Sequence, residues 1–388
     1  MTTIPNSNSN PGAPPSGRRP TRLIVDTGVI ERNAGIIRES LSPGTRLMAV
    51  VKAHAYGHGA VETARAALRG GATNLGVATV AEAHELRESG IDASILVLGP
   101  SDPSESVIAA RMDVAIGVGD HVQAKRLCAA LSRSGAERPL SVHLKIDTGM
   151  RRFGVDLDES AVVAQLLADC PDVSLEGMYS HFAEADDASP DRMDEQFITF
   201  CRTRAKLSAI GIEPEIAHIS NSAALLRNRF TDLNMVRAGI CLYGIPPSNH
   251  IDLFEGMQPA LEWRATLQHI ALMSPGDRTG YGGTYVATEQ ERIGILPIGY
   301  ADGYPRSLSN VGWVGFHGHS LPIRGRISMD QCAVGIPNDL DLQVGDEVSV
   351  IGPTETGAPS VNQLAAAIDT IGYEIVARLS RRIPVDFI

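Results

Sequence analysis

The sequence predicts an α/β protein, a (β/α)8 TIM-type barrel followed by a smaller, mostly-β domain. A chain of 388 residues is longer than one hydrophobic core usually organises, so two domains are expected. From about residue 45, short apolar runs alternate with longer amphipathic segments, which is the pattern of parallel strands joined by helices. Eight such runs in series favour a closed barrel over an open doubly wound sheet.

The barrel strands are predicted from apolar runs rich in β-branched residues. They are Leu47–Lys52, Asn74–Thr79, Ser94–Leu98, Asp113–Val118, Ser141–Ile146, Ser174–Ser180, Glu215–Ile219 and Asn234–Ile240. Helical patterns lie between them, for example Ala81–Ser89, Val122–Ser132 and Asp194–Ala209. Because the strands of a parallel barrel end at one face, polar side chains that follow these runs should gather at a single site.

The pattern of apolar segments changes after about Gln258, which indicates that a second domain begins there. Its apolar runs are shorter and broken by turns such as Ser274-Pro275-Gly276-Asp277; they are Leu261–Met273, Arg292–Pro297, Leu321–Ile327 and Glu347–Ile351. We expect the barrel over residues 32–257 and the β domain over residues 258–388. A strand within residues 21–31 could join either domain, and we assign it to the β domain.

The composition excludes several classes of protein. No apolar run approaches the roughly 18 residues that a membrane span requires. A net charge of −11 repels phosphate backbones and anionic lipids, so neither nucleic acid nor a membrane is an expected partner. Five scattered cysteines without a CxxC pair indicate neither a disulfide framework nor a zinc site, and fit a reducing cytoplasm. Residues 1–20, rich in Pro, Ser and Asn, are predicted to form a disordered tail.

Polar motifs directly follow the predicted strands. They are Lys52 in VVKAHAYGHG, Lys145 and Arg152 in HLKIDTGMRR, His181 in MYSHF, Asn221 and Ser222 in HISNSAA, and Arg237, Gly239 and Ile240 in MVRAGI. A lysine that follows a buried strand tends toward the neutral amine, which acts as a nucleophile or base. Taken alone, Lys52 would be interpreted as an ordinary strand-end lysine that reaches water. Its neighbours favour the chemical interpretation.

A phosphorylated ligand is predicted from the hydroxyls and glycines of these motifs. Tyr56 and Ser222 offer hydroxyls, and Gly239-Ile240 follows the eighth strand, where barrels commonly bind phosphate through backbone N–H groups. Gly239 could instead merely turn the chain. His54 and His58 are spaced four apart, but no third ligand accompanies them, so no metal site is expected.

The motifs VVKAHAYGHG, HLKIDTGM, HISNSAA, MVRAGICLYG, TGYGGTY, IGYADGYPR and RISMDQ resemble, in this order, those of the alanine racemase family. The resemblance covers residue 21 to the end of the chain. It implies a pyridoxal 5'-phosphate-dependent isomerase that interconverts L-alanine and D-alanine. It also implies a cytoplasmic, head-to-tail homodimer in which the β domain completes the partner's active site.

The two catalytic bases are assigned by this resemblance. Lys52 resembles the lysine that carries the cofactor and acts as one base. Tyr281, in Gly280-Tyr281-Gly282, resembles the opposite base, which the partner subunit supplies. A free tyrosine ionises near pH 10, so a catalytic tyrosine needs charged or hydrogen-bonding groups that stabilise its phenolate. His181 and Arg237 resemble the family residues that do so.

Arg237 also resembles the residue that faces the pyridine nitrogen of the cofactor. An arginine has only donors, so that nitrogen should stay unprotonated, which weakens the electron sink and favours racemisation over transamination. Arg152 resembles the residue that contacts the phenolic oxygen of the cofactor and the substrate carboxylate. Lys145 resembles a lysine carbamylated by carbon dioxide, whose negative charge would orient Arg152. Lys145 could instead pair with Asp147.

The remaining site residues are also implied by the resemblance. The further cofactor contacts are Tyr56, Asn221, Ser222, the backbone of Gly239 and Ile240, and Tyr373. From the partner, Tyr300, Met329 and Asp330 would line the substrate pocket, with Arg306 and Arg326 at its entrance. Bulky Tyr300 and Tyr373 leave room for little beyond a methyl side chain.

Three residues depart from the family pattern. Arg151 stands where glycine usually follows DTGM, Ala238 replaces a proline, and Ser328 replaces a cysteine. Two adjacent arginines therefore compete for the cofactor-facing role. Arg152 is the better choice because it directly precedes Phe153-Gly154.

Three alternatives stay open at the level of sequence. A racemase of broader specificity would act on serine or larger amino acids, but the two pocket tyrosines and Lys145 favour alanine. A barrel that binds the cofactor without turnover would need neither the β domain nor Tyr281. A decarboxylase of similar architecture predicts a cysteine and acidic residues around the pyridine nitrogen, where this chain has Arg237.

Overall fold

The computed structural model describes residues 19–135, 138–231 and 233–388, so almost all of the predicted tail lies outside the described residues. The chain divides into two compact units. One unit is Asp26–Ala260; the other combines the segment up to Val25 with Leu261–Ile388. We call them the barrel unit and the β unit. In the described part of the chain, no helix combines the length and apolarity needed to cross a bilayer.

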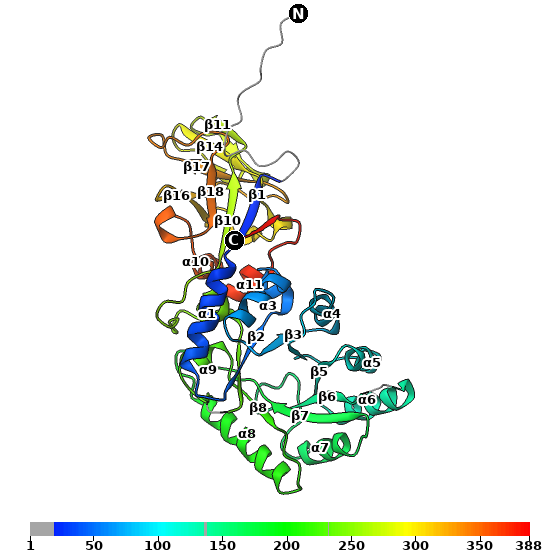
Figure 1. The fold of residues 1–388 in the computed structure, drawn as a ribbon. Helices are drawn as coiled ribbons and strands as arrows, with labels where there is room; N and C mark the ends of the chain where they lie inside the picture. Colours follow the sequence, from blue (N-terminus) through cyan, green and yellow to red (C-terminus); the bar gives the residue numbers. More distant parts are fainter. Residues whose placement is uncertain (1–18, 136–137, 232) are drawn as a thin grey trace, which may run out of the picture. The chain divides into compact units, whose positions relative to one another are not determined.

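The barrel unit is built on an eight-stranded parallel sheet in the order β8-β7-β6-β5-β4-β3-β2-β9 (Figure 1). The strands are β2 (Arg46–Val50), β3 (Asn74–Val77), β4 (Ser94–Val97), β5 (Val114–Val118), β6 (Leu140–Lys145), β7 (Val173–Tyr179), β8 (Ile216–His218) and β9 (Met235–Ala238). The end strands β8 and β9 contact each other, partly through a hydrogen bond from Ala217 N–H to Asn234 Oδ1 at 3.0 Å. The predicted (β/α)8 architecture is confirmed, and each predicted strand differs from the observed one by at most two residues at either end.

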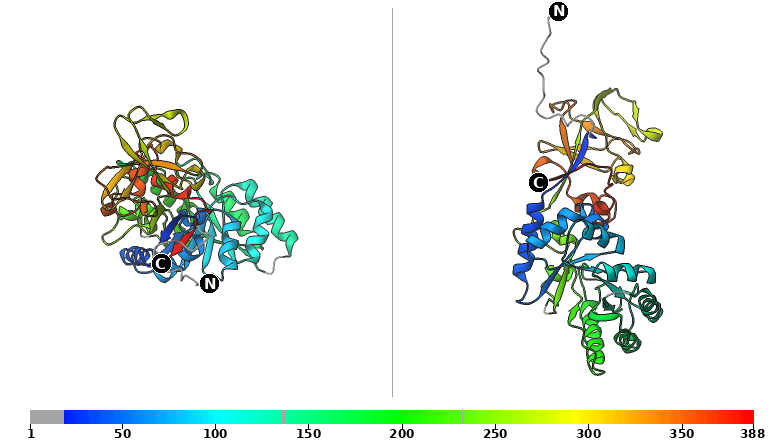
Figure 2. Two further views of the ribbon diagram at one scale, coloured as in Figure 1. Left: turned by 90° about the horizontal axis from the view of Figure 1, so that it is seen from above. Right: turned by 45° about the vertical axis from the view of Figure 1, so that its right-hand side comes forward.

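The crossover helices begin where the sequence supplies caps. They are α1 (Thr27–Ser40), α3 (Ala60–Arg69), α4 (Val80–Glu88), α5 (Pro103–Arg111), α6 (His121–Ser134), α7 (Ser160–Ala168), α8 (Arg192–Ser208) and the short α9 (Ser222–Leu226). Capping boxes of Thr79 with Glu82 and of Asp102 with Glu105 satisfy the first amides of α4 and α5. Figures 1 and 2 show helices α4 to α7 outside the strands of the barrel.

The inside of the barrel is a packed core. Met48, Leu96, Ile216 and Met235, from β2, β4, β8 and β9, form one buried cluster. Each of these side chains is at most 2% exposed, and burial of a side chain of this size stabilises a fold by about 1.5–3 kcal/mol. The core therefore supports the strand ends at which the polar motifs lie.

The β unit contains sheets of six, three and two strands. The six-stranded sheet has the order β16-β15-β18-β10-β1-β19, the three-stranded sheet β11-β14-β17, and the pair β12-β13. The strands are β1 (Thr21–Val25), β10 (Leu261–Thr266), β11 (His269–Met273), β12 (Arg278–Thr279), β13 (Tyr285–Val286), β14 (Glu291–Leu296), β15 (Trp313–Phe316), β16 (His319–Pro322), β17 (Cys332–Ile336), β18 (Glu347–Ile351) and β19 (Val385–Phe387). Short helices α10 (Val361–Ala366) and α11 (Gly372–Ala377) precede β19.

β1, near the start of the chain, pairs with two strands from the later part of the chain. It pairs antiparallel with β10 and parallel with β19, and the left view of Figure 2 shows β1 in blue beside β19 in red. Trp263 of β10 is buried and donates from Nε1 to the Thr21 hydroxyl of β1 at 2.8 Å. The early strand thus belongs to the β unit.

Two predicted runs of the β unit were wrong in extent. Leu261–Met273 is not one strand, because Leu267 and Gln268 separate β10 from β11. Only the start of Leu321–Ile327 lies in a strand: β16 ends at Pro322, and Gly325 then adopts a φ of 76°.

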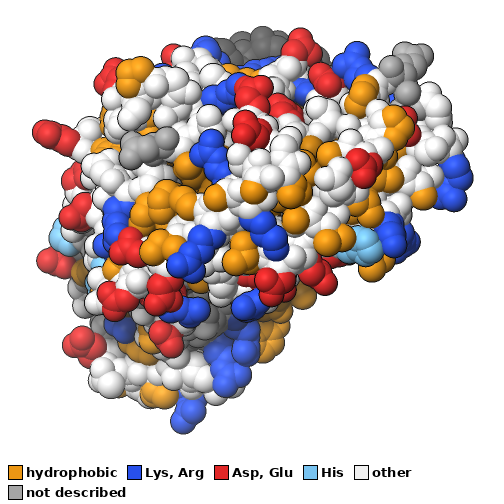
Figure 3. Space-filling view, turned by 90° about the horizontal axis from the view of Figure 1, so that it is seen from below, with side chains coloured by type: hydrophobic (Ala, Val, Ile, Leu, Met, Phe, Trp, Pro, Cys, Tyr) orange, Lys and Arg blue, Asp and Glu red, His pale blue; other side chains and the backbone are white. Residues whose placement is uncertain are grey.

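Acidic and basic side chains are interspersed on the face seen in Figure 3, so the net negative charge of −11 does not form a single acidic patch on that face.

A buried carboxylate holds the β unit together. The Asp302 side chain has no exposed surface, yet it pairs with Arg19 and with Arg382 Nε at 2.8 Å and accepts the Gly299 N–H at 2.9 Å. Burial would raise the pKa of this carboxyl, but the hydrogen bonds from Arg19, Arg382 and Gly299 outweigh burial and hold the pKa below its usual value.

We predict that Asp302→Ala lowers the free energy of unfolding of the β unit by about 1–3 kcal/mol, because it leaves the buried Gly299 N–H without an acceptor and removes the shared carboxylate partner of Arg19 and Arg382. Thermal unfolding followed by circular dichroism measures the loss. Asp339→Ala, at an exposed position, is the matched control and should stay within about 0.5 kcal/mol of the unchanged protein. Equal stability of the two variants would contradict the prediction.

Candidate active site

The carboxyl ends of the barrel strands bring the predicted polar residues together. Lys52 follows β2, Lys145 ends β6, His181 follows β7 and Arg237 lies in β9. Arg152, on the loop after β6, acts electrostatically on Lys52, Lys145 and His181. Sequence reasoning therefore located one real cluster, which is strongly positive.

Lys52 lies just beyond the end of β2, which stops at Val50, two residues earlier than predicted. Burial lowers the pKa of the Lys52 ammonium; the positive charges of Arg152 and Arg237 lower it too, while Glu82 opposes them. The neutral amine is the form that attacks carbonyl carbons or takes up protons. Its surroundings thus prepare Lys52 for either role.

The backbone after Lys52 takes a rare left-handed turn. Ala53, His54, Ala55 and Tyr56 all have φ of 53–54°, although none is glycine. This conformation costs about 1–2 kcal/mol per residue for an L-amino acid, so surrounding contacts must hold it. One contact is Glu82, whose Oε1 accepts the Ala53 N–H at 2.7 Å while its Oε2 accepts the Ala78 N–H at 2.7 Å.

His58 supports the same turn from inside the barrel unit. Its ring is fully buried, lies 4.4 Å from the Tyr243 ring, and donates from Nδ1 to the Tyr56 carbonyl at 2.9 Å. Tyr243 in turn donates its hydroxyl to the Val50 carbonyl at 2.8 Å. His54 instead lies 4.0 Å from Glu85, so the two histidines have separate structural partners.

Arg237 is buried at the centre of a hydrogen-bond network. Its Nη1 contacts His218 Nδ1 at 2.9 Å, and its Nη2 contacts His181 Nδ1 at 3.0 Å. Nη2 also donates to the carbonyls of Ser180 at 2.7 Å and Ile219 at 3.0 Å. Since a guanidinium has no acceptor, all four partners must accept.

This requirement assigns the protons of two histidines, His218 and His143. With Nδ1 accepting from Arg237, neutral His218 carries its proton on Nε2 and donates to His143 Nδ1 at 3.0 Å. The His143 proton then sits on Nε2, which is 3.9 Å from a Glu176 carboxylate oxygen. Burial and then the charge of Arg237 lower the pKa of His181 and His218 well below the ordinary value and that of His143 to about 3.

Lys145 is buried among positive charges. Its Nζ lies 5.0 Å from the centre of the Tyr179 ring and makes a 3.3 Å hydrogen bond to the Ile146 carbonyl. Burial, followed by the charges of Arg237 and Arg152, lowers the pKa of Lys145 to about 7, while Asp147 opposes them. The Asp147 carboxylate accepts the N–H groups of Gly149 at 2.8 Å and Arg151 at 3.1 Å.

A small cradle lies beside this cluster. A side chain at Gly239 would place its Cβ 2.9 Å from the Tyr56 hydroxyl and 3.5 Å from Ser222 Oγ. Ser222 Oγ accepts the Gly239 N–H at 2.9 Å, and Ile240 begins the buried 3-10 turn η1 (Ile240–Tyr243). The absence of a side chain at Gly239 thus leaves room beside the Tyr56 and Ser222 hydroxyls, and such hydroxyls suit a phosphate. Asn221, by contrast, caps α9 by accepting the Ala224 N–H at 3.0 Å.

The two adjacent arginines differ in their surroundings. Both are exposed, but only the charge of Arg152 is among the groups that lower the pKa values of Lys52, Lys145 and His181. Arg151 has φ of 55°, in the left-handed region that glycine adopts without strain. The pKa effects support Arg152 as the residue that faces the site. The left-handed φ at Arg151 explains why the family pattern has a glycine at this position.

The other predicted site residues lie in the β unit. Tyr281 begins the short turn η2 (Tyr281–Gly283) and is 70% exposed; Met329 is 53% and Tyr300 43% exposed. Asp330 accepts from Arg382 Nη2 at 2.7 Å. Tyr373 lies in α11, half-buried, and Arg306 begins the 3-10 turn η4 (Arg306–Leu308). The Arg326 backbone would be 3.0 Å from a Cβ added at Gly280, next to Tyr281.

A buried amine, two hydroxyls beside Gly239 and two arginines lie at the carboxyl ends of the barrel strands, where barrel enzymes hold their active sites. Two family models match the chain: the alanine racemase N-terminal domain over residues 25–247 and the alanine racemase C-terminal domain over residues 260–387. The chain belongs to the alanine racemase family.

Similar proteins agree along nearly the whole chain. An alanine racemase of Symbiobacterium thermophilum is 40% identical over 372 residues, which are 95% of this chain and 97% of that protein. One of Geobacillus stearothermophilus is 40% identical over 373 residues, 94% of this chain and 93% of that protein. The crystal structure of alanine racemase from Bacillus anthracis with bound L-Ala-P has a TM-score of 0.90 and 37% identity, and covers 97% of this chain and 96% of that chain.

Acid should destabilise the barrel unit well before its carboxylates titrate. Burial lowers the pKa of His58 to about 4 and that of His143 to about 3, from about 6.5 when unfolded. The contribution of these neutral histidines to the free energy of unfolding is therefore complete above pH 6.5. It is lost as the pH falls from 6.5 toward their pKa values in the folded protein. We predict a loss of up to about 1.4 kcal/mol per pH unit for each buried neutral histidine.

Urea unfolding at pH values between 6.5 and 4.5 measures this slope. His143→Gln should reduce the slope, whereas His250→Gln, at an exposed position, should leave it unchanged. Stability that stays constant across this window in the unchanged protein would contradict the proton positions assigned to the network.

Arg151→Gly should stabilise the barrel unit by about 1 kcal/mol, since glycine removes the left-handed strain at φ of 55°. Arg133→Gly in the regular helix α6 is the opposite-sign control and should cost about 1 kcal/mol. Thermal unfolding compares the two variants. If both variants were destabilised alike, the backbone at Arg151 would not be strained.

Proposed function

We propose that the protein is a pyridoxal 5'-phosphate-dependent alanine racemase that interconverts L-alanine and D-alanine. The observation that carries the proposal is the juxtaposition of Lys52, with its lowered pKa, and donor-only Arg237 at one end of the barrel. Membership of the alanine racemase family supports the same conclusion. When bound, the cofactor withdraws electrons from the α-carbon of the amino acid and so acidifies its proton.

The residues present fit this cofactor. The space at Gly239, edged by the Tyr56 and Ser222 hydroxyls, suits its phosphate. The Lys52 amine would hold its aldehyde carbon, and the Arg237 guanidinium would face its ring nitrogen. Because Arg237 offers only donors and does not readily lose a proton, it would favour an unprotonated ring nitrogen, at which the cofactor would be a weaker electron acceptor. Asn221 and Tyr373 complete the proposed contacts.

Racemisation needs two proton-transferring groups on opposite faces of the substrate. We assign one to Lys52 Nζ and the other to the Tyr281 hydroxyl, supplied by the β unit of a partner subunit in a homodimer. The 70% exposure of Tyr281 leaves it free to meet such a partner. Tyr300, Met329 and Asp330 would line the same pocket, and His181 would support the tyrosinate.

Carbamylation of Lys145 is proposed from its surroundings. Carbon dioxide reacts with a neutral amine, and a pKa of about 7 leaves much of the Lys145 amine neutral near pH 7. The nitrogen attacks the carbon, one proton leaves, and a carbamate anion remains. That anion would lie among Arg152 and Arg237, where it would offset their positive charge and orient Arg152 toward the substrate carboxylate.

The direct test is chiral analysis of products. The purified protein, given the cofactor and L-alanine, should form D-alanine until the two enantiomers are equal. Borohydride reduction followed by peptide mapping should place the pyridoxyl group on Lys52. Lys52→Ala and Tyr281→Ala homodimers should both lose nearly all activity.

A mixed dimer of these two variants tests whether the site is shared. If Tyr281 serves the partner's Lys52, one of the two sites in the heterodimer carries both changes and the other carries neither. Activity per verified heterodimer should then return to about half of the unchanged level. If both residues came from one chain, every site would carry a change, and no activity would return.

Lys145→Ala should lose activity through misorientation of Arg152 and regain part of it when a small carboxylate is added, because that anion can take the place of the carbamate. A Lys52→Ala enzyme is the control that no carboxylate should rescue. Lack of rescue in Lys145→Ala, together with an unmodified Lys145 by mass spectrometry of the intact protein, would overturn the proposal.

A further inference from the structure

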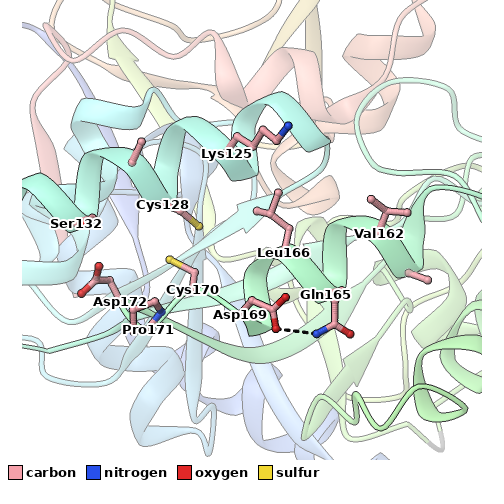
Figure 4. Close-up of a pocket in the computed structure, with 12 residues that line it drawn as sticks. Lys125, Cys128, Ser132, Val162, Gln165, Leu166, Asp169, Cys170, Pro171 and Asp172 are labelled. Atoms are coloured by element: carbon pink, nitrogen blue, oxygen red, sulfur yellow. Dashed lines mark hydrogen bonds between the residues drawn. The ribbon is translucent and has the colours of Figure 1, made fainter.

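Two cysteines face each other in a groove that shares no residue with the Lys52 site. The groove has a volume of about 900 Å³ and lies between α6, α7 and the loop that follows α7. Cys128 projects from α6 and Cys170 from the loop, and Figure 4 shows their sulfur atoms directed toward each other. Neither cysteine is part of a disulfide bond.

We propose that Cys128 and Cys170 form an oxidisable dithiol, which a peroxide converts to an intramolecular disulfide. The opposed sulfur atoms meet the first geometric condition for a bridge, since cysteines whose side chains point apart cannot close without backbone movement. Cys128 is half-buried and lines the groove, so a small oxidant can reach it, whereas Cys170 is buried beside it.

The oxidation balances with one peroxide molecule. The Cys128 thiolate attacks a peroxide oxygen, the O–O bond breaks, hydroxide leaves, and a sulfenic acid forms on Cys128. The Cys170 sulfur then displaces hydroxide from that sulfur and the S–S bond forms. In total, two thiols lose two protons and two electrons, and hydrogen peroxide becomes two molecules of water.

The local charges set the rate of this reaction. Burial, the neighbouring Cys170 and the carboxylate of Asp172 raise the pKa of the Cys128 thiol to about 12. Because only the thiolate attacks, the bridge should form slowly near neutral pH and faster as the pH rises. The dithiol would therefore respond to sustained rather than brief exposure to oxidant.

The bridge would close a loop that carries active-site residues. The segment between Cys128 and Cys170 contains β6 with Lys145 and the following loop with Arg152. A cross-link across such a segment removes conformations from the unfolded chain. We therefore expect oxidation to raise the midpoint of thermal unfolding of the barrel unit by at least about 3 °C.

The test uses the full-length protein treated with hydrogen peroxide at mildly alkaline pH. After free thiols are alkylated, peptide mapping without reductant should show Cys128 linked to Cys170, and dithiothreitol should reverse the link. Cys201→Ser is the matched control: it removes an exposed cysteine of α8 outside the pair and should leave the link intact.

Cys128→Ser and Cys170→Ser should each abolish the link and the rise in the unfolding midpoint. The proposal is overturned if Cys128 and Cys170 both stay alkylatable after oxidation, or if Cys128 proceeds to sulfinic acid without a cross-link. It is also overturned if the link forms no faster at higher pH. Because these readouts need neither cofactor nor substrate, they are independent of the proposed racemase activity.

Discussion

The buried Arg237 guanidinium is the constraint on which the rest of the site depends. A cation removed from water must be surrounded by acceptors, and this one takes two imidazole nitrogens and two backbone carbonyls. Those acceptors come from β8 and from the segments that follow β7 and β8. One side chain therefore fixes the ends of neighbouring strands, and at the same time requires His181 and His218 to be neutral.

Because the histidines are neutral, the lasting positive charge of the site comes from Arg152 and Arg237, and Lys52 and Lys145 add to it only when they are protonated. Such a concentration of positive charge in a partly buried place attracts anions and suppresses the protonation of its own amines. A phosphate, a substrate carboxylate and a carbamate would each reduce the excess. Burial and this positive charge together account for the lowered pKa of both lysines, and the charge favours anionic ligands.

The strands of the barrel could be predicted because each one is a local run of apolar residues. Most candidate site residues of the barrel could be predicted because they directly follow these runs in the sequence. Sequence reasoning missed His143, His218 and Tyr179, which lie within strands, although a polar residue inside a buried run such as AHIS was a usable signal. It could not find the left-handed turn at Ala53–Tyr56, since the sign of φ there depends on Glu82 and His58, contacts formed only in the folded state.

The position of β1 between β10 and β19 affects when the six-stranded sheet can form during synthesis. A ribosome releases β1 first, then the whole barrel unit, and only afterwards the two strands that flank β1. Domains generally fold as they emerge, so the barrel can complete its core while β1 waits with both edges unpaired. The β1 edge of the six-stranded sheet therefore stays unpaired until β19 (Val385–Phe387) has been translated and takes the edge position beside it.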